Sequence, residues 1–173
     1  MERSAPLRFA NSSFEELPKE IRSKVESVRE TRRGLYIWGP VGTGKTYAAF
    51  AIMKKLGDMG IRARFYTAPE LLDLLRDDFD HKDSYNLDRL LESRAALIID
   101  DLGAEKSSEW VTETLHKIID KRYREVLPTY ITSNNSLDEL VARVGDRIPS
   151  RLAEMCDIIK LDGQDRRLST PQK

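Results

Sequence analysis

The chain has 173 residues, of which 40% are hydrophobic and 34% charged, a composition typical of one globular domain with a sizeable core. Its 29 basic and 29 acidic residues cancel, which excludes an overall electrostatic attraction to nucleic acid and leaves only local patches for such binding. The single cysteine, Cys156, excludes an internal disulfide, and with no signal-peptide pattern and no apolar run of about 18 residues we expect a cytoplasmic protein without membrane contact.

The first thirty residues predict a helical N-terminal extension. Ser13-x-x-Glu16 has the pattern of a capping box, and Ile21, Val25 and Val28 follow at helical spacing, which predicts one helix over residues 15–30. Basic residues outnumber acidic ones in this segment. They form either a solvated helix face or a contact with a polyanion.

A phosphate-binding loop follows a short apolar strand at Leu35–Trp38. The next residues read G-x-x-x-x-G-K-T and are Gly39, Pro40, Val41, Gly42, Thr43, Gly44, Lys45 and Thr46. Glycines let successive backbone N–H groups point into one concavity, while Lys45 reaches the β- and γ-phosphates and Thr46 offers its hydroxyl to Mg²⁺. The apolar residues 47–53 then predict a buried helix that ends near Gly57, so strand, loop and helix follow in the order that a nucleotide site requires.

The next segment predicts a strand, a helix and an acidic surface. Residues 62–67 alternate in polarity as a strand does, and Thr67-x-Pro69-Glu70 is typical of a helix start. From Glu70 to Glu92 the chain carries eight acidic and three basic residues. We expect this stretch to repel a phosphate backbone.

Two adjacent acids follow a buried strand at residues 95–99. Asp100 and Asp101 would be costly to bury unpaired in a core. At the carboxyl end of a central parallel strand they lie where α/β sheets bind ligands. Asp100 is therefore predicted to hold Mg²⁺ through water, and Asp101 to polarise the attacking water.

A second buried strand is predicted at residues 129–134, after an amphipathic helix over residues 108–125. Beside the Asp100 strand, Asn134 would point at the γ-phosphate and orient the attacking water. The capping-box pattern Ser136-x-x-Glu139 follows directly. His81 and His116 have no partner at metal-ligand spacing and are interpreted as ordinary surface residues.

Five phrases occur in order along the chain: GPVGTGKT, LIIDD, TSN, GDRIPSRL and GQDRR. Together they resemble the AAA+ ATPases of the DnaC/DnaI helicase-loader and IstB transposition-helper family, from about Phe9 to Arg167. The resemblance implies a P-loop α/β fold whose five-stranded parallel sheet, in order 5-1-4-3-2, is flanked by helices with little or no lid domain. It assigns residues 31–173 to the ATPase domain and leaves residues 1–30 as the extension.

The resemblance also implies a role for each matching residue of the nucleotide site. Lys45 and Thr46 correspond to the Walker A pair, and Asp100 and Asp101 to the Walker B pair. Asn134 corresponds to sensor 1. ATP and Mg²⁺ are the implied cofactors.

Three arginines in the last third of the chain receive roles only from the resemblance. Arg151 corresponds to the arginine finger, with Arg147 as a second candidate, and Arg167 corresponds to sensor 2 at the bound nucleotide. A finger completes the site of a neighbouring protomer, so the family implies self-association through the ATP site.

The family implies a protein that hydrolyses ATP while it assembles on a replicative DNA helicase, with single-stranded DNA as a further partner. An IstB-like transposition helper that binds duplex DNA is an alternative, although the zero net charge disfavours it. A nucleotide-dependent interaction switch with little hydrolysis is another, because Asp101 is one methylene shorter than the glutamate of most AAA+ proteins. The Asp-Asp-Leu-Gly and Thr-Ser-Asn phrases disfavour a small-molecule kinase, and a missing Asn-Lys-x-Asp motif disfavours a GTPase.

The family's loaders carry an additional amino-terminal domain that grips the helicase, and this sequence does not contain it. We therefore expect either a fragment or a partner contact elsewhere, for example in residues 1–30.

Overall fold

One parallel sheet forms the centre of the molecule. The computed structural model of the chain describes residues 9–80, 85–104 and 108–163. Its strands are β1 Gly34–Trp38, β2 Ala63–Thr67, β3 Ala96–Leu102, β4 Thr129–Ser133 and β5 Cys156–Lys160. They lie in the order β2-β3-β4-β1-β5, and every neighbouring pair is parallel. This confirms the predicted five-stranded sheet in order 5-1-4-3-2, read from the opposite edge.

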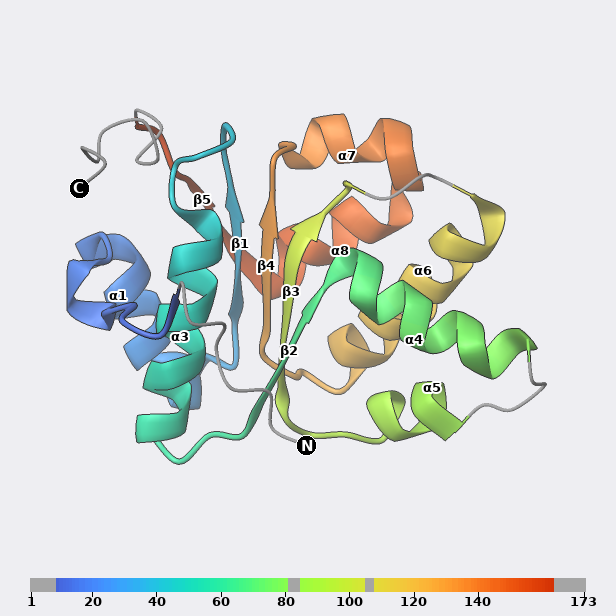
Figure 1. Cartoon of the computed structure of the whole chain (residues 1–173), viewed down its shortest axis with the longest axis horizontal. Coiled ribbons are helices and arrows are strands. Elements are labelled where there is room, and N and C mark those ends of the chain that lie inside the picture. Colours follow the sequence, from blue (N-terminus) through green and yellow to red (C-terminus); the bar gives the residue numbers. More distant parts are fainter. Residues whose placement is uncertain (1–8, 81–84, 105–107, 164–173) are drawn as a thin grey trace.

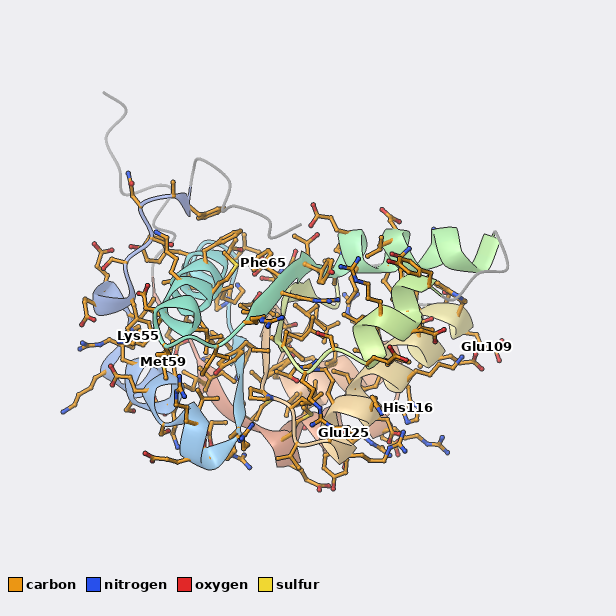
Figure 2. All side chains as sticks on the ribbon, turned by 90° about the horizontal axis from the view of Figure 1, so that it is seen from below. Lys55, Met59, Phe65, Glu109, His116 and Glu125 are labelled. Atoms are coloured by element: carbon orange, nitrogen blue, oxygen red, sulfur yellow. The ribbon has the colours of Figure 1, made fainter. Side chains whose placement is uncertain are left out.

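Helices cover both faces of the sheet (Figure 1). One face carries the short helix η2 Phe14–Glu16 with α1 Lys19–Glu26, α2 Val28–Thr31 and α3 Lys45–Asp58. The other face carries α4 Ala68–Asp80, α5 Tyr85–Leu91, α6 Glu109–Arg124, α7 Leu137–Val144 and α8 Arg147–Met155. Figure 2 shows the two sides: Lys55 of α3 and Met59, which follows this helix, lie on one, and Glu109 and His116 of α6 lie on the other with Glu125, which follows α6.

The central strands feed both cores, because successive side chains of a strand point to opposite faces. Leu97 and Ile99 of β3 pack with α6 and α4, whereas Ile98 packs with α3. Sheets buried on both faces require such continuous apolar runs. None of the helices in the described residues has the length and hydrophobicity that a membrane-spanning helix requires.

The predicted single helix over residues 15–30 is wrong in its continuity. The structure breaks it into η2, α1 and α2, and the Ser13 side chain makes no capping bond. Pro18 explains the break between η2 and α1, since proline disfavours a helical conformation in the residue before it. Leu17 is accordingly extended, with φ −74° and ψ 151°, and α1 starts only after Pro18.

Other sequence-predicted helix starts are confirmed. Thr67 and Glu70 exchange hydrogen bonds across the start of α4, and Ser136 and Glu139 form the capping box of α7. The last strand starts two residues before its predicted position at 158, because Cys156 and Asp157 already pair with Gly34 and Leu35 of β1. These elements place the carboxyl ends of β1, β3 and β4 at one edge of the sheet.

Candidate functional site: a nucleotide site at the carboxyl edge of the sheet

The phosphate-binding loop joins the end of β1 to the start of α3. Gly42 and Gly44 have φ of 86° and 94°, in the left-handed region that glycine adopts without strain. At Gly39 a Cβ atom would lie 2.2 Å from the Leu161 carbonyl oxygen, so only glycine fits there. The loop therefore curls tightly and leads directly into α3, whose N-terminus starts at Lys45.

Lys45 is buried with only 7% of its surface exposed. Its ammonium donates hydrogen bonds to the Gly39 carbonyl at 2.8 Å and to the Pro40 carbonyl at 2.7 Å. These contacts hold a positive charge inside the loop. The backbone N–H groups of the first turn of a helix have no acceptor within the helix. A buried cation beside them is an arrangement that binds phosphate.

Asp100 connects the phosphate-binding loop to β4. Its Oδ2 accepts a hydrogen bond from the Thr46 hydroxyl at 2.9 Å, and its Oδ1 accepts one from the Thr132 hydroxyl at 2.5 Å. Burial raises the pKa of Asp100, and the hydrogen bonds from Thr132 and Thr46 act in the opposite direction. Burying the charged carboxylate of Asp100 costs free energy, and a cation bound beside it would offset that cost.

A bulge in β3 brings both acids to the same site. The register between β3 and β4 shifts between Ile99 and Leu102, and Asp101 has φ 61°. In a regular strand Asp100 and Asp101 would point to opposite faces, whereas a bulge re-aims one side chain. The Asp101 carboxylate consequently accepts a hydrogen bond from the Asn134 side-chain amide at 2.9 Å. Such backbone strain is typical of functional sites.

The oxygen donors around Thr46 and Asp100 fit Mg²⁺. This ion prefers oxygen ligands and keeps several waters, so one or two protein ligands together with nucleotide phosphates suffice. The described residues contain no group of three or more His, Cys, Asp or Glu side chains that would cage a metal. The donor set therefore suits an ion that arrives with a triphosphate.

Thr132 is a site residue that sequence reasoning missed. Besides donating to Asp100, its hydroxyl oxygen accepts a hydrogen bond from the backbone N–H of Asp101 at 2.9 Å. One side chain thus fixes both acids, and it is only 2% exposed. The signal was present in the Thr-Ser-Asn phrase, from which only Asn134 received a role. The next residue, Ser133, donates a hydrogen bond to the Leu102 carbonyl at 2.6 Å and so ties β4 to the end of β3.

We expect Thr132→Val to raise the Mg²⁺ concentration needed for half-maximal ATP turnover by about 10- to 100-fold, as loss of a ligand's supporting hydrogen bond typically does. Valine keeps the shape and strand preference of threonine but cannot orient Asp100. Thr132→Ser restores the hydroxyl and should behave like the wild type. The measurement is turnover against Mg²⁺ at fixed ATP. If Thr132→Val needed no more Mg²⁺ than Thr132→Ser and the wild type, Thr132 would serve only in packing.

The structure does not bring the candidate arginines to this cluster. Arg151 lies on α8, where its Nη2 is 2.6 Å from Asp120 Oδ1 of α6. Arg147 is exposed at the start of the same helix and lines a pocket of about 300 Å³ between α6 and the α7–α8 turn. Arg167 lies outside the described residues.

His116 lines the same pocket and differs from its predicted surface role. Its side chain is half-buried, and its buried Nε2 atom has no hydrogen-bond partner among the described residues. His81 lies outside the described residues.

The chain is similar in sequence to a helicase loader and to an insertion-sequence ATP-binding protein. DnaI, the replicative helicase loader of Bacillus subtilis strain 168, is 28% identical over 158 residues, which are 83% of this chain and 51% of DnaI. An insertion-sequence ATP-binding protein of Geobacillus stearothermophilus is 32% identical over 145 residues, 80% of this chain and 57% of that protein. The chain thus spans about half the length of these curated relatives.

Solved structures extend the likeness to the fold. A crystal structure of the DnaC helicase loader superposes with a TM-score of 0.80 at 31% identity, over 91% of this chain and 100% of that one. The family described as IstB-like ATP binding protein matches residues 9–173. The chain therefore belongs to the IstB-like ATP binding protein family, and its fold is that of the AAA+ P-loop ATPases.

Proposed function

We propose that this chain hydrolyses ATP with Mg²⁺ and uses ATP-dependent assembly to act on a replicative DNA helicase. The observation that carries the proposal is the convergence of Lys45, Thr46, Asp100, Asp101 and Asn134 at the carboxyl edge of the sheet, joined by the hydrogen bonds of Asp100 and Asp101. Such an edge is where open α/β sheets bind ligands. Membership in the IstB-like family disfavours the two alternatives of a small-molecule kinase and a GTPase.

Each side chain of the cluster has a distinct role in this proposal. Lys45 and the N–H groups at the start of α3 bind the β- and γ-phosphates, and Thr46 and Asp100 hold Mg²⁺, which neutralises developing charge. Asn134 orients the attacking water. Asp101 accepts its proton, and the hydrogen bond to Asn134 keeps that carboxylate in place.

The arginine that completes the site comes, in our proposal, from a second copy of the chain. Arg151 is the first candidate and Arg147 the second: the described contacts of Arg151 are with α6, and Arg147 is exposed at the start of α8. Arg167 is proposed to contact the nucleotide of its own protomer. Residues 31–173 form the ATPase domain in this scheme, and residues 1–30 an extension; Ile21 and Val25 pack into the core around α3.

The helicase as partner rests on relatives that are named helicase loaders. The alternative partner, duplex DNA during transposition, rests on the insertion-sequence relative. Single-stranded DNA is a further proposed partner, although the acidic residues between Glu70 and Glu92 disfavour binding there. Tyr85 is the one aromatic side chain of that stretch that the structure describes as strongly exposed, at 61%.

We expect the chain to co-elute with the replicative helicase of its own cell when ATP is present, and to separate from it with ADP. The reason is that only the triphosphate bridges neighbouring protomers. Size-exclusion chromatography with light scattering measures the complex, and Arg124→Ala, on the exposed side of α6, serves as a surface control. Binding of duplex DNA without binding of the helicase would favour the transposition role.

A further inference from the structure

Arg151 is held firmly although it lies at the surface. Its guanidinium forms an ion pair with Asp120 at 2.6 Å and lies over the ring of Tyr123, with Cζ 5.6 Å from the ring centroid. Both partners are on α6, whereas Arg151 is on α8. The Tyr123 hydroxyl in turn donates a hydrogen bond of 2.6 Å to the Glu154 carboxylate of α8, which fixes the ring beneath the guanidinium.

Two contacts leave most of the guanidinium available. An arginine offers five N–H donors, and Asp120 takes one of those on Nη2. Among the described residues, Arg151 Nε is buried without a partner. Asp120 also pairs with Arg124 at 2.9 Å, so its single negative charge is shared between two arginines. Arg151 therefore keeps net positive charge and N–H donors on Nη1 and Nη2 for an anion, whereas its buried Nε cannot meet an anion from outside the chain.

The position of this group disfavours a role at the protomer's own phosphates. The helix α6 connects β3 to β4 and so runs back from the carboxyl edge of the sheet. Asp120 follows Glu109, the first residue of α6, by eleven residues, roughly 16 Å along the axis. We therefore expect the anion that meets Arg151 to come from a second copy of the chain.

We infer that Asp120 and Tyr123 are positioning residues that present Arg151 to the ATP bound by a neighbouring copy of this chain. This inference rests on the proposed function. It names the residues that position Arg151 for its contact with the ATP of the neighbouring protomer. Holding the guanidinium in advance saves the rotamer entropy of a long side chain, which would otherwise be lost in the transition state. The competing explanation is that the ion pair merely joins α6 to α8.

The first test measures kcat and KM of Asp120→Asn and of Tyr123→Leu at a protein concentration where the wild type is assembled. We expect kcat to fall about 10- to 100-fold, the effect of a misplaced catalytic group, with KM for ATP unchanged. Tyr123→Phe keeps the ring and loses only the hydrogen bond to Glu154, so its kcat should fall less than that of Tyr123→Leu. Lys117→Ala, on the exposed side of the same helix, is the matched control and should also retain activity. Wild-type kcat in Asp120→Asn would overturn the inference.

The second test mixes variants and separates positioning from stability. Lys45→Ala protomers have no working site but carry an intact Arg151 with its support, and Asp120→Asn protomers have a working site but a misplaced finger. Mixed in equal amounts, they should turn over ATP several-fold faster than the sum of the two alone. A mixture no faster than that sum would overturn the inference, provided that Lys45→Ala restores activity to Arg151→Ala.

The control mixture, Lys45→Ala with Arg151→Ala, distinguishes a failure of the positioning role from a failure of the proposed function. If Arg151→Ala regains activity with Lys45→Ala but Asp120→Asn does not, only the positioning role fails. If neither regains activity while the wild type hydrolyses ATP, Arg151 is no trans-acting finger, and the inference fails together with this part of the proposed function.

Discussion

Lys45→Ala lowers the affinity for ATP by at least about 100-fold, the expected loss when one partner of a buried, hydrogen-bonded charge pair is removed. In the structure the Lys45 ammonium is buried and held by the Gly39 and Pro40 carbonyls. In the proposed function it binds the phosphates from this place. Alanine is a good helix former, so α3 should still start at this position. The measurement is titration with a fluorescent ATP analogue.

Lys55→Ala provides a matched control for this variant. Lys55 is on the same helix, but in its last turn, where it pairs with Glu26 at 3.6 Å and lies over the Phe14 ring. Its removal should leave ATP affinity unchanged. Retained ATP affinity in Lys45→Ala would contradict the phosphate-loop assignment itself.

Asp101→Asn should abolish most hydrolysis while sparing ATP binding. Loss of a general base typically costs about 10²- to 10⁴-fold in turnover. Asparagine is a clean substitution here, because Asp101 has φ 61° and asparagine tolerates that left-handed conformation. The side-chain oxygen can still accept the hydrogen bond from Asn134, so the change removes charge and basicity rather than shape.

The experiment pairs single-turnover hydrolysis with ATP binding, and Asp138→Asn on the exposed first turn of α7 is the control. If the wild type has measurable turnover and Asp101→Asn hydrolyses ATP equally fast, Asp101 takes no part in the hydrolysis step. A wild type that binds ATP without turnover, alone and with its helicase, would favour the interaction switch.

The features that sequence could predict are those fixed by local chemistry. The G-x-x-x-x-G-K-T spacing placed the loop between β1 and α3, and polar residues after apolar runs placed Asp100 and Asn134 at strand ends. The strand order came from the family resemblance, since periodicity alone does not say which strands pair. One local break could be read from the sequence: Pro18 separates η2 from α1, and the prediction of one helix over residues 15–30 did not use it.

Long-range geometry could not be predicted in the same way. The bulge that turns Asp101 towards Asn134 depends on the register between β3 and β4, which no local pattern encodes. Thr132 supports both acids only because β3 and β4 are neighbours. The contact of Arg151 with Asp120 and Tyr123 joins two helices that are packed together but distant in sequence. A surface arginine in isolation gives no sign of such a support.

In the proposed function, each ATP site needs an arginine from a second copy of the chain. The most direct test measures ATP hydrolysis per protomer over a wide range of protein concentration, with the helicase and single-stranded DNA each present or absent. We expect a specific rate that rises with concentration until the protein is fully assembled, and we expect this rise to be lost in Arg151→Ala. A specific rate that is measurable and independent of concentration would show that each chain carries a complete site, and would rule out an arginine supplied by a second copy.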